Sequence, residues 1–166
     1  MAGSPLSDEQ LAAWRAFLRA QATVLAALER ELEAERGLPI AFYDVLVQLD
    51  EAGGHLRMSE LAERVVLSRS GVTRLVDRME REGLVERRAC PSDRRGTEAV
   101  LTKQGQKTLA DSWPVHARGV AEHFANHLNP EEVAVLTEAL GRMSEGDGDS
   151  CPWTPADGRE ERAQRS

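Results

Sequence analysis

Arginine is concentrated in one part of the chain. Nine arginines and five acidic residues lie between Arg64 and Arg95, a local charge of +4, whereas the rest of the chain carries 12 basic and 23 acidic residues. The guanidinium group forms paired hydrogen bonds with phosphate and with atoms O6 and N7 of guanine. A basic segment in an acidic chain is typical of a protein that contacts nucleic acid through one surface.

Small hydroxyl side chains accompany these arginines in a predicted helix that begins at Ser68 and ends at Gly83. Its apolar residues, such as Val72, repeat at helical spacing, so the polar residues of the first turns face the other way. Ser and Thr hydroxyls bond to bases or to phosphates. Arg78 and Arg81 fit either a DNA contact or a solvated helix face with weak side-chain pairs. We expect DNA contacts from Ser68, Arg69, Ser70, Thr73 and Arg74.

A basic turn at residues 91–96 separates two predicted strands, residues 84–90 and 97–101. Arg94 and Arg95 are adjacent and would repel each other, so an anionic partner explains their presence best. A narrow minor groove has a strongly negative potential that attracts arginine. Asp93 would repel phosphate, and we therefore expect it to orient an arginine or to cap the turn.

The elements that must position these residues form a helix, a tight turn, a second helix and a hairpin. The first helix spans residues 59–65 with Ser59 as its cap, and a short extended segment, residues 55–57, precedes it. This arrangement places the second helix in the DNA major groove. The residues expected to face inward are Leu61, Ala62, Val65, Val72, Leu75, Val76 and Met79.

Two further helices precede this unit. Ser7 and Gln10 have capping-box spacing, and a helix over residues 7–36 ends before Gly37. Its long apolar seam suggests packing on a partner chain. The second helix starts at Pro39 and stops at Gly53-Gly54. The seam consists of Leu11, Trp14, Leu18, Leu25, Leu28 and Leu32, and the buried face of the second helix of Phe42, Val45, Leu46 and Leu49.

Two more helices follow the hairpin, the first capped by Thr102 and the second by Asn129. Pro114 is expected to kink or divide the first of them. The predicted inward residues are Leu109, Trp113, Val120, Phe124 and Leu128, then Val133, Leu136, Leu140 and Met143. The fold class is therefore mainly α with a small β-hairpin wing. We expect one domain over residues 1–166: dimerisation helices at 7–36 and 103–144, a winged helix-turn-helix at 39–102, and a disordered tail at 145–166 that contains Cys151 and Trp153.

Several classes of protein are not indicated. The chain has no apolar run long enough for a membrane span and no secretion signal, so the cytoplasm is expected. Its two cysteines, Cys90 and Cys151, do not make a disulfide framework or a zinc site. His123 and His127 are four residues apart, but two ligands are not a metal site, so no metal or cofactor is expected. Phosphate-binding and nucleophile motifs are absent, which argues against an enzyme. A protein-interaction module without DNA binding is an alternative.

The same segment closely resembles the multiple antibiotic resistance regulator (MarR) family over about residues 55–105. The resemblance is carried by Leu61-Ala62-Glu63-Arg64, Leu67-Ser68-Arg69-Ser70-Gly71-Val72-Thr73-Arg74-Leu75-Val76-Asp77-Arg78-Met79-Glu80, Gly83-Leu84-Val85-Glu86-Arg87, Asp93-Arg94-Arg95-Gly96 and Leu101-Thr102. It implies an obligate homodimer with the recognition helix in the major groove and the wing in the minor groove. It also implies that Arg95 enters the minor groove and that Asp93 orients it. Ser59, Arg87 and Arg94 complete the expected set of DNA contacts.

The resemblance further implies a repressor that binds a pseudo-palindromic operator. Such a repressor releases the DNA when a small, often phenolic, molecule binds or when a cysteine is oxidised. The oxidation-sensing members carry a reactive cysteine near the start of the first helix, and this chain has none there. A redox role for Cys90 is an alternative, although a small residue that ends a strand is the commoner explanation. Four aromatic residues fit either an apolar ligand pocket or, as we favour, the core and dimer seam: Trp14, Phe17, Phe42 and Trp113. The sequence does not indicate which small molecule would bind.

Overall fold

The computed structural model describes residues 6–65, 69–90 and 93–144. These residues form two compact units that divide after Leu128. The predicted tail at 145–166, with Cys151 and Trp153, lies outside the described residues. Within the described ranges, no helix combines the length and the apolar character needed to cross a membrane.

The first helix, α1 (Asp8–Arg36), has the ends that the sequence predicts. The Ser7 hydroxyl accepts a hydrogen bond from the Gln10 backbone N–H at 3.1 Å, and the Gln10 side chain accepts one from the Ser7 N–H at 2.9 Å. Gly37 adopts the left-handed conformation, with φ of 62°, and its N–H donates to the Glu33 carbonyl. The predicted capping box and glycine stop are confirmed, because both depend only on neighbouring residues.

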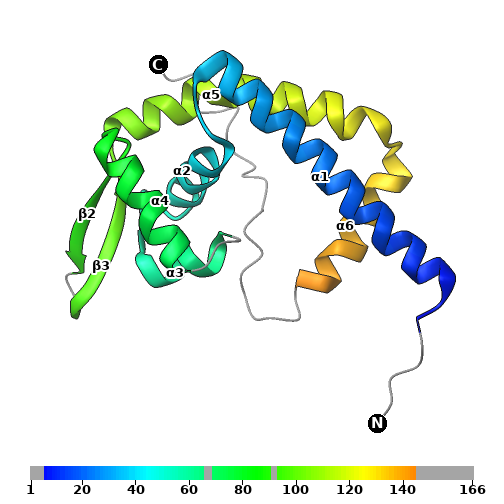
Figure 1. Cartoon of the computed structure of the whole chain (residues 1–166), viewed down its shortest axis with the longest axis horizontal. Coiled ribbons are helices and arrows are strands. Elements are labelled where there is room, and N and C mark those ends of the chain that lie inside the picture. The colour runs from blue at the N-terminus through cyan, green and yellow to red at the C-terminus, as the bar shows by residue number, and fades with distance from the viewer. Residues whose placement is uncertain (1–5, 66–68, 91–92, 145–166) are drawn as a thin grey trace, which may run out of the picture. The chain divides into compact units, whose positions relative to one another are not determined.

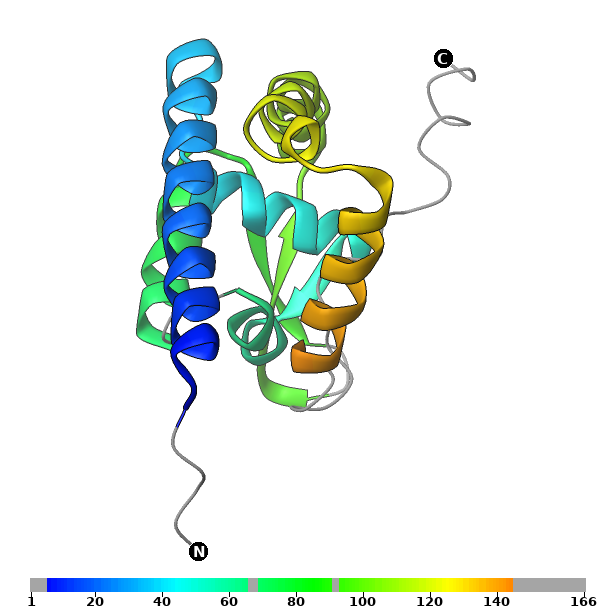
Figure 2. The same cartoon turned by 90° about the vertical axis from the view of Figure 1, so that its right-hand side faces the viewer.

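Helix α2 (Ile40–Glu51) is the centre of the core in the first unit. The predicted inner face is confirmed, since Phe42, Val45, Leu46 and Leu49 are all fully buried. Tyr43, Val47 and Gln48 are buried too, so the helix is enclosed on nearly all sides. Its neighbours are α1, α5, the helix-turn-helix and the sheet, as Figure 2 shows. A helix buried this fully fixes the positions of the elements around it.

Three antiparallel strands form the sheet, in the order β1 (His55–Arg57), β3 (Asp93–Leu101), β2 (Val85–Cys90). The predicted extended segment is therefore an edge strand. The predicted hairpin is confirmed, but its second strand, β3, begins at Asp93, which pairs with Cys90, and not at Thr97 as predicted. The register shifts between Ala89, opposite Thr97, and Cys90, so the extra residues 94–96 are accommodated as an irregularity in β3.

The helix-turn-helix consists of α3 (Met58–Arg64) and α4 (Arg69–Arg81). The predicted cap at Ser59 is wrong: α3 begins one residue earlier, because the Arg57 N–H donates to the Glu60 carboxylate at 3.2 Å. The predicted cap at Ser68 lies outside the described residues. Among the predicted inward residues Ala62 is half-buried, and the others are buried as expected: Leu61, Val65, Val72, Leu75, Val76 and Met79.

Helix α5 (Lys103–His123) starts at the predicted cap. The Thr102 hydroxyl accepts a hydrogen bond from the Gly105 N–H at 3.0 Å and donates one to the Gly83 carbonyl at 2.6 Å. These bonds join the start of α5 to the residues that follow α4. Pro114 was expected to kink or divide this helix, and it does not divide it, since α5 continues through this residue. Leu109 and Val115 are buried on either side of the proline and hold the helix to the core.

The predicted burial pattern of α5 is only partly correct. The helix ends at His123 and a short 3₁₀ turn, η1 (Ala125–His127), follows it. Trp113 and Phe124, which we expected to face inward, are 36% and 44% exposed. Periodicity detects an apolar face but does not tell whether the face packs within the chain or on a partner.

The second described unit contains α6 (Pro130–Ser144). The Asn129 and Glu132 side chains each accept a hydrogen bond from the other residue's backbone N–H at 2.9 Å, which confirms the predicted start of the helix. Val133, Leu140 and Met143 were expected to face inward but are 44%, 37% and 75% exposed in the single chain.

His116 of α5 makes folding stability depend on pH. Its ring centroid lies 4.4 Å from that of Tyr43, and burial lowers the pKa of its imidazole below the ordinary value. Below about pH 6.5 the unfolded chain therefore takes up a proton that the folded chain resists, so stability is lost as the pH falls. Replacement of His116 by Phe should reduce this loss between about pH 7.5 and 5.5. Thermal unfolding at both pH values tests this, with exposed His127→Phe as control; equal pH slopes for both variants would contradict it.

Candidate nucleic-acid interface

Helices α3 and α4 and the hairpin of β2 and β3 gather at one end of the first unit (Figure 1). Residues Ser70, Thr73 and Arg74 are exposed on α4, while Val72 and Leu75 between them are buried. The alternation places the three predicted polar residues on the outer face of the helix. Arg69 is the first residue of α4, and its side chain lies outside the described part of the structure.

Ser59, Thr73 and Arg87 come from α3, α4 and β2, and all three line one hollow of about 550 Å³. Ser59 is exposed in the first turn of α3 although it is not the cap. The fold therefore brings together three of the predicted site residues that the sequence separates. The hollow lies beside the outer face of α4, and Asp77 lines it as well, so a carboxylate accompanies the hydroxyl and guanidinium groups there.

The Arg87 side chain of β2 forms ion pairs and a hydrogen bond with residues of α4. Its Nη1 pairs with the carboxylates of Asp77 and Glu80, the latter at 3.0 Å, and its Nη2 donates to the Thr73 carbonyl at 3.0 Å. The Arg87 backbone N–H also donates to Glu80 at 3.1 Å. One side chain of β2 thus holds the wing to α4. This role of Arg87 was not predicted from the sequence, although two acidic residues one turn apart on a basic helix were a possible signal.

Removal of this link should loosen the wing. We expect Arg87→Met, which keeps most of the aliphatic stem, to lower the free energy of unfolding by about 1–2 kcal/mol, because charged hydrogen bonds to partly buried groups are lost. Arg88 is the matched control: it lies next in β2, is exposed and pairs with the exposed carboxylate of Glu86 at 2.9 Å. Arg88→Met should change stability by less than about 0.5 kcal/mol. Denaturant titration compares them, and equal losses would refute the proposed link.

The other predicted residues are placed only in part. Arg94 and Arg95 lie in β3 together with Asp93, and their side chains are outside the described part, so the predicted pairing of Asp93 with an arginine stays a prediction. Arg78 lies 5.0 Å from the centre of the Phe42 ring, a cation–π distance, which gives it a packing role. Cys90 is 5% exposed, so access of an oxidant to its thiol is restricted.

A helix-turn-helix followed by a basic β-hairpin defines a winged helix, a class of DNA-binding domain. A family model described as MarR family matches residues 36–96. AbsC from Streptomyces coelicolor, a MarR family transcriptional regulator, is 38% identical, with 86% of this chain and 96% of that chain covered and a TM-score of 0.78. Sco3205 from the same organism, a MarR family regulator solved in complex with DNA, is 34% identical, with 92% and 99% covered and a TM-score of 0.81.

A curated relative agrees with these structures. The transcriptional repressor MdtR of Bacillus subtilis is 31% identical over 149 residues, which are 86% of this chain and 89% of MdtR. The chain therefore belongs to the MarR family of helix-turn-helix transcriptional regulators. The family and the winged-helix fold expected from the sequence are both confirmed.

Proposed function

We propose that the protein represses transcription as a homodimer bound to a pseudo-palindromic operator. The observation that carries this proposal is the exposed row Ser70, Thr73 and Arg74 on α4, beside a wing that contains two further arginines. In this arrangement α4 lies in the major groove, where Arg74 bonds to a base edge, and the Ser and Thr hydroxyls bond to bases or phosphates. The rest of the chain is acidic, and its negative charge repels the DNA phosphates, so only the basic surface approaches the duplex.

The wing supplies the second set of contacts. Arg95 enters the minor groove and Asp93 orients it, while Arg94, Arg69 and Ser68 contact the backbone. Ser59 contributes a phosphate contact from the hollow beside α4. Since the Arg87 guanidinium is already bonded to Asp77, Glu80 and Thr73, it acts chiefly by positioning the wing.

The dimer is supported by apolar surface that a monomer would leave in water. Trp14, Phe17, Leu18 and Leu25 are each more than 40% exposed on α1. In the other described unit, Val135 and Met143 of α6 are 65% and 75% exposed. Contiguous apolar faces of this kind mark protein interfaces. We therefore assign dimerisation to residues 7–36 and 103–144 and DNA binding to 39–102, with two half-sites about 10 bp apart.

Regulation by a small aromatic molecule completes the proposal. Phe42 is fully buried in the core, whereas the stacked rings of Trp14 and Phe17 are exposed, with centroids 6.0 Å apart. A repressor of this kind would act on DNA in the cytoplasm, and we assign it no catalytic activity. A redox switch through Cys90 is less favoured because the thiol is buried, and an interaction module without DNA binding does not explain the basic hairpin.

Selection of genomic fragments by the purified full-length protein tests the function. We expect enrichment of sites with two-fold symmetry. Because a dimer neutralises about 6–10 phosphates, affinity for an enriched site should fall about 10³- to 10⁵-fold between about 50 and 200 mM salt. Absence of enrichment, or binding that does not respond to salt, would favour the interaction module.

A further inference from the structure

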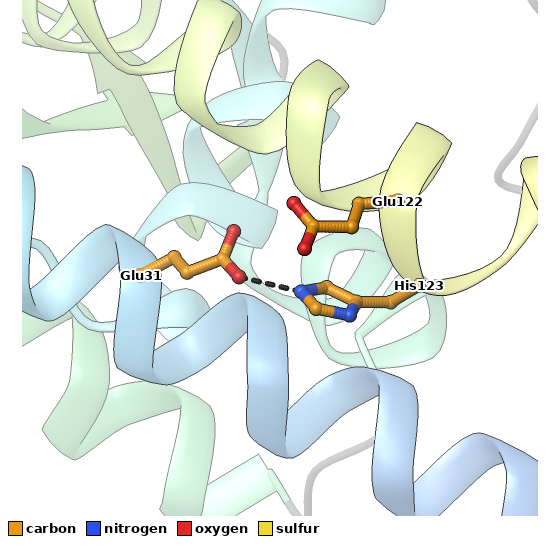
Figure 3. Close-up of side chains that lie close together, drawn as sticks. All are labelled: Glu31, Glu122 and His123. Carbon is orange, nitrogen blue, oxygen red and sulfur yellow. Dashed lines mark hydrogen bonds and ion pairs between the residues drawn. The ribbon is translucent and has the colours of Figure 1, made fainter.

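A histidine and two glutamates meet where α1 passes the end of α5. Glu31 comes from α1, and Glu122 and His123 come from the last turn of α5, with the three side chains pointing toward one another (Figure 3). His123 Nε2 lies 2.5 Å from Glu31 Oε1, and one ligand atom from each residue lies within 4.8 Å of the others. His127, the partner considered from sequence, lies beyond the end of α5 and is exposed.

A simple pair between His123 and Glu31 leaves part of this cluster unexplained. The second Glu31 oxygen, Oε2, is buried and has no hydrogen-bond partner among the described residues. Buried carboxylate oxygens are normally satisfied by a donor or by a cation. The Glu122 carboxylate adds a second negative charge beside it. A cation that contacts both carboxylates would satisfy the buried oxygen and relieve their repulsion.

The approach of the two helices depends on Gly119. A Cβ atom at this position would lie 2.8 Å from Glu31 Oε2 and 2.6 Å from Leu28 Cδ2, so a larger residue would displace the carboxylate. Gly119 is buried inside α5, where glycine lowers helix propensity. The glycine therefore admits two side chains of α1, Leu28 and Glu31, close to the backbone of α5. All three candidate ligands also stand on helices, which limits their movement.

We propose that Glu31, Glu122 and His123 form a binding site for a divalent first-row transition-metal ion, with Zn²⁺ as the probe. An imidazole nitrogen with two carboxylates suits such ions, whereas Mg²⁺ and Ca²⁺ prefer oxygen ligands alone. Tetrahedral Zn²⁺, at about 2.0–2.2 Å from each ligand, separates ligand atoms by roughly 3.4 Å. His123 and Glu31 must therefore move slightly apart while exposed Glu122 rotates inward. Three protein ligands leave the fourth position to water.

The ion would fasten α1 to α5 through ligands from both helices. Metal that binds only the folded chain raises the unfolding temperature, and the rise grows with the logarithm of the ion concentration once that concentration exceeds the dissociation constant. This consequence does not depend on the proposed operator or effector.

Two titrations of the metal-free full-length protein test the site. Calorimetry follows the binding of Zn²⁺, and visible absorption follows the binding of Co²⁺. We expect one high-affinity ion per chain, a higher unfolding temperature with Zn²⁺, and no thiolate charge-transfer band with Co²⁺. Replacement of Glu122 by Gln should weaken binding by at least about tenfold, since even loss of an outer-shell partner costs that much. Because Glu122 is exposed, its replacement leaves the core intact. His123→Ala should weaken binding to the same extent.

His127→Ala is the matched control and should bind Zn²⁺ as the unaltered chain does. The proposal is overturned if neither Zn²⁺ nor Co²⁺ binds to the full-length chain. It is also overturned if Glu122→Gln and His123→Ala bind the ion as tightly as the His127→Ala control. A thiolate band in the Co²⁺ spectrum would show ligation by cysteine and would overturn the proposal too. An equal rise of unfolding temperature with Mg²⁺ would overturn the assignment to a transition metal.

Discussion

Replacement of Arg74 by alanine is expected to weaken operator binding by about 1–3 kcal/mol for each half-site, and replacement of Arg95 by a similar amount. Arg74 stands on the exposed face of α4, and its loss would remove the proposed bidentate contact with a base. Loss of Arg95 would remove the charge that we propose to enter the minor groove. Anisotropy titrations of a selected operator at one fixed salt concentration measure both effects.

The two losses should differ in character. Arg74→Ala should relax discrimination at one base pair of each half-site, whereas Arg95→Ala should reduce the preference for a narrow, A·T-rich minor groove. Arg81 is the matched control because it lies in the last turn of α4, far from the end that approaches the bases. Arg81→Ala should weaken all sequences alike and to a smaller extent. If folded Arg74→Ala and Arg95→Ala proteins bind the operator as tightly as the original chain, these residue assignments are wrong.

Leu18→Glu on α1 should convert the dimer to a monomer of 18.3 kDa and abolish tight operator binding. Leu18 lies on an apolar stripe with Trp14 and Leu25, and it is 41% exposed in the single chain, so glutamate is tolerated by the monomer. Burial of an unpaired carboxylate in a dimer interface costs several kcal/mol. Without the dimer the two half-sites bind independently, and affinity should fall at least about a hundredfold. Light scattering after gel filtration gives the mass.

Ala16→Glu adds the same charge two residues away, about 200° around the helix. Ala16 is exposed and lies away from the apolar stripe, so this variant should remain a dimer and bind DNA normally. A dimeric Leu18→Glu protein with full affinity would place the subunit interface elsewhere.

Local features of the fold were predictable from the sequence. The reciprocal bonds of Ser7 with Gln10 and of Asn129 with Glu132 involve residues three apart, and such spacing is visible in the chain. The inner face of α2 followed from its helical period. The polar row on α4 followed in the same way, because the buried residues of a helix determine which residues face outward.

Features that depend on distant residues were not predictable. His123 and Glu31 are 92 residues apart, and no single-sequence pattern joins them. Arg87 was expected to contact DNA because its position lies in a basic motif, yet the structure engages its guanidinium with Asp77 and Glu80. Trp113 and Phe124 were expected to be buried, and periodicity does not reveal whether a partner chain supplies that burial. The start of β3 was missed because basic turn residues hid a continuing ladder.

Because Arg87 ties β2 to α4, the parts of the protein proposed to enter the two grooves are held at a fixed separation. A duplex must then adapt its own twist and groove width to that separation, and the elastic cost of doing so depends on base-pair steps that no side chain touches. The link between wing and helix would thus select operators by the stiffness of their intervening sequence as well as by the bases in contact.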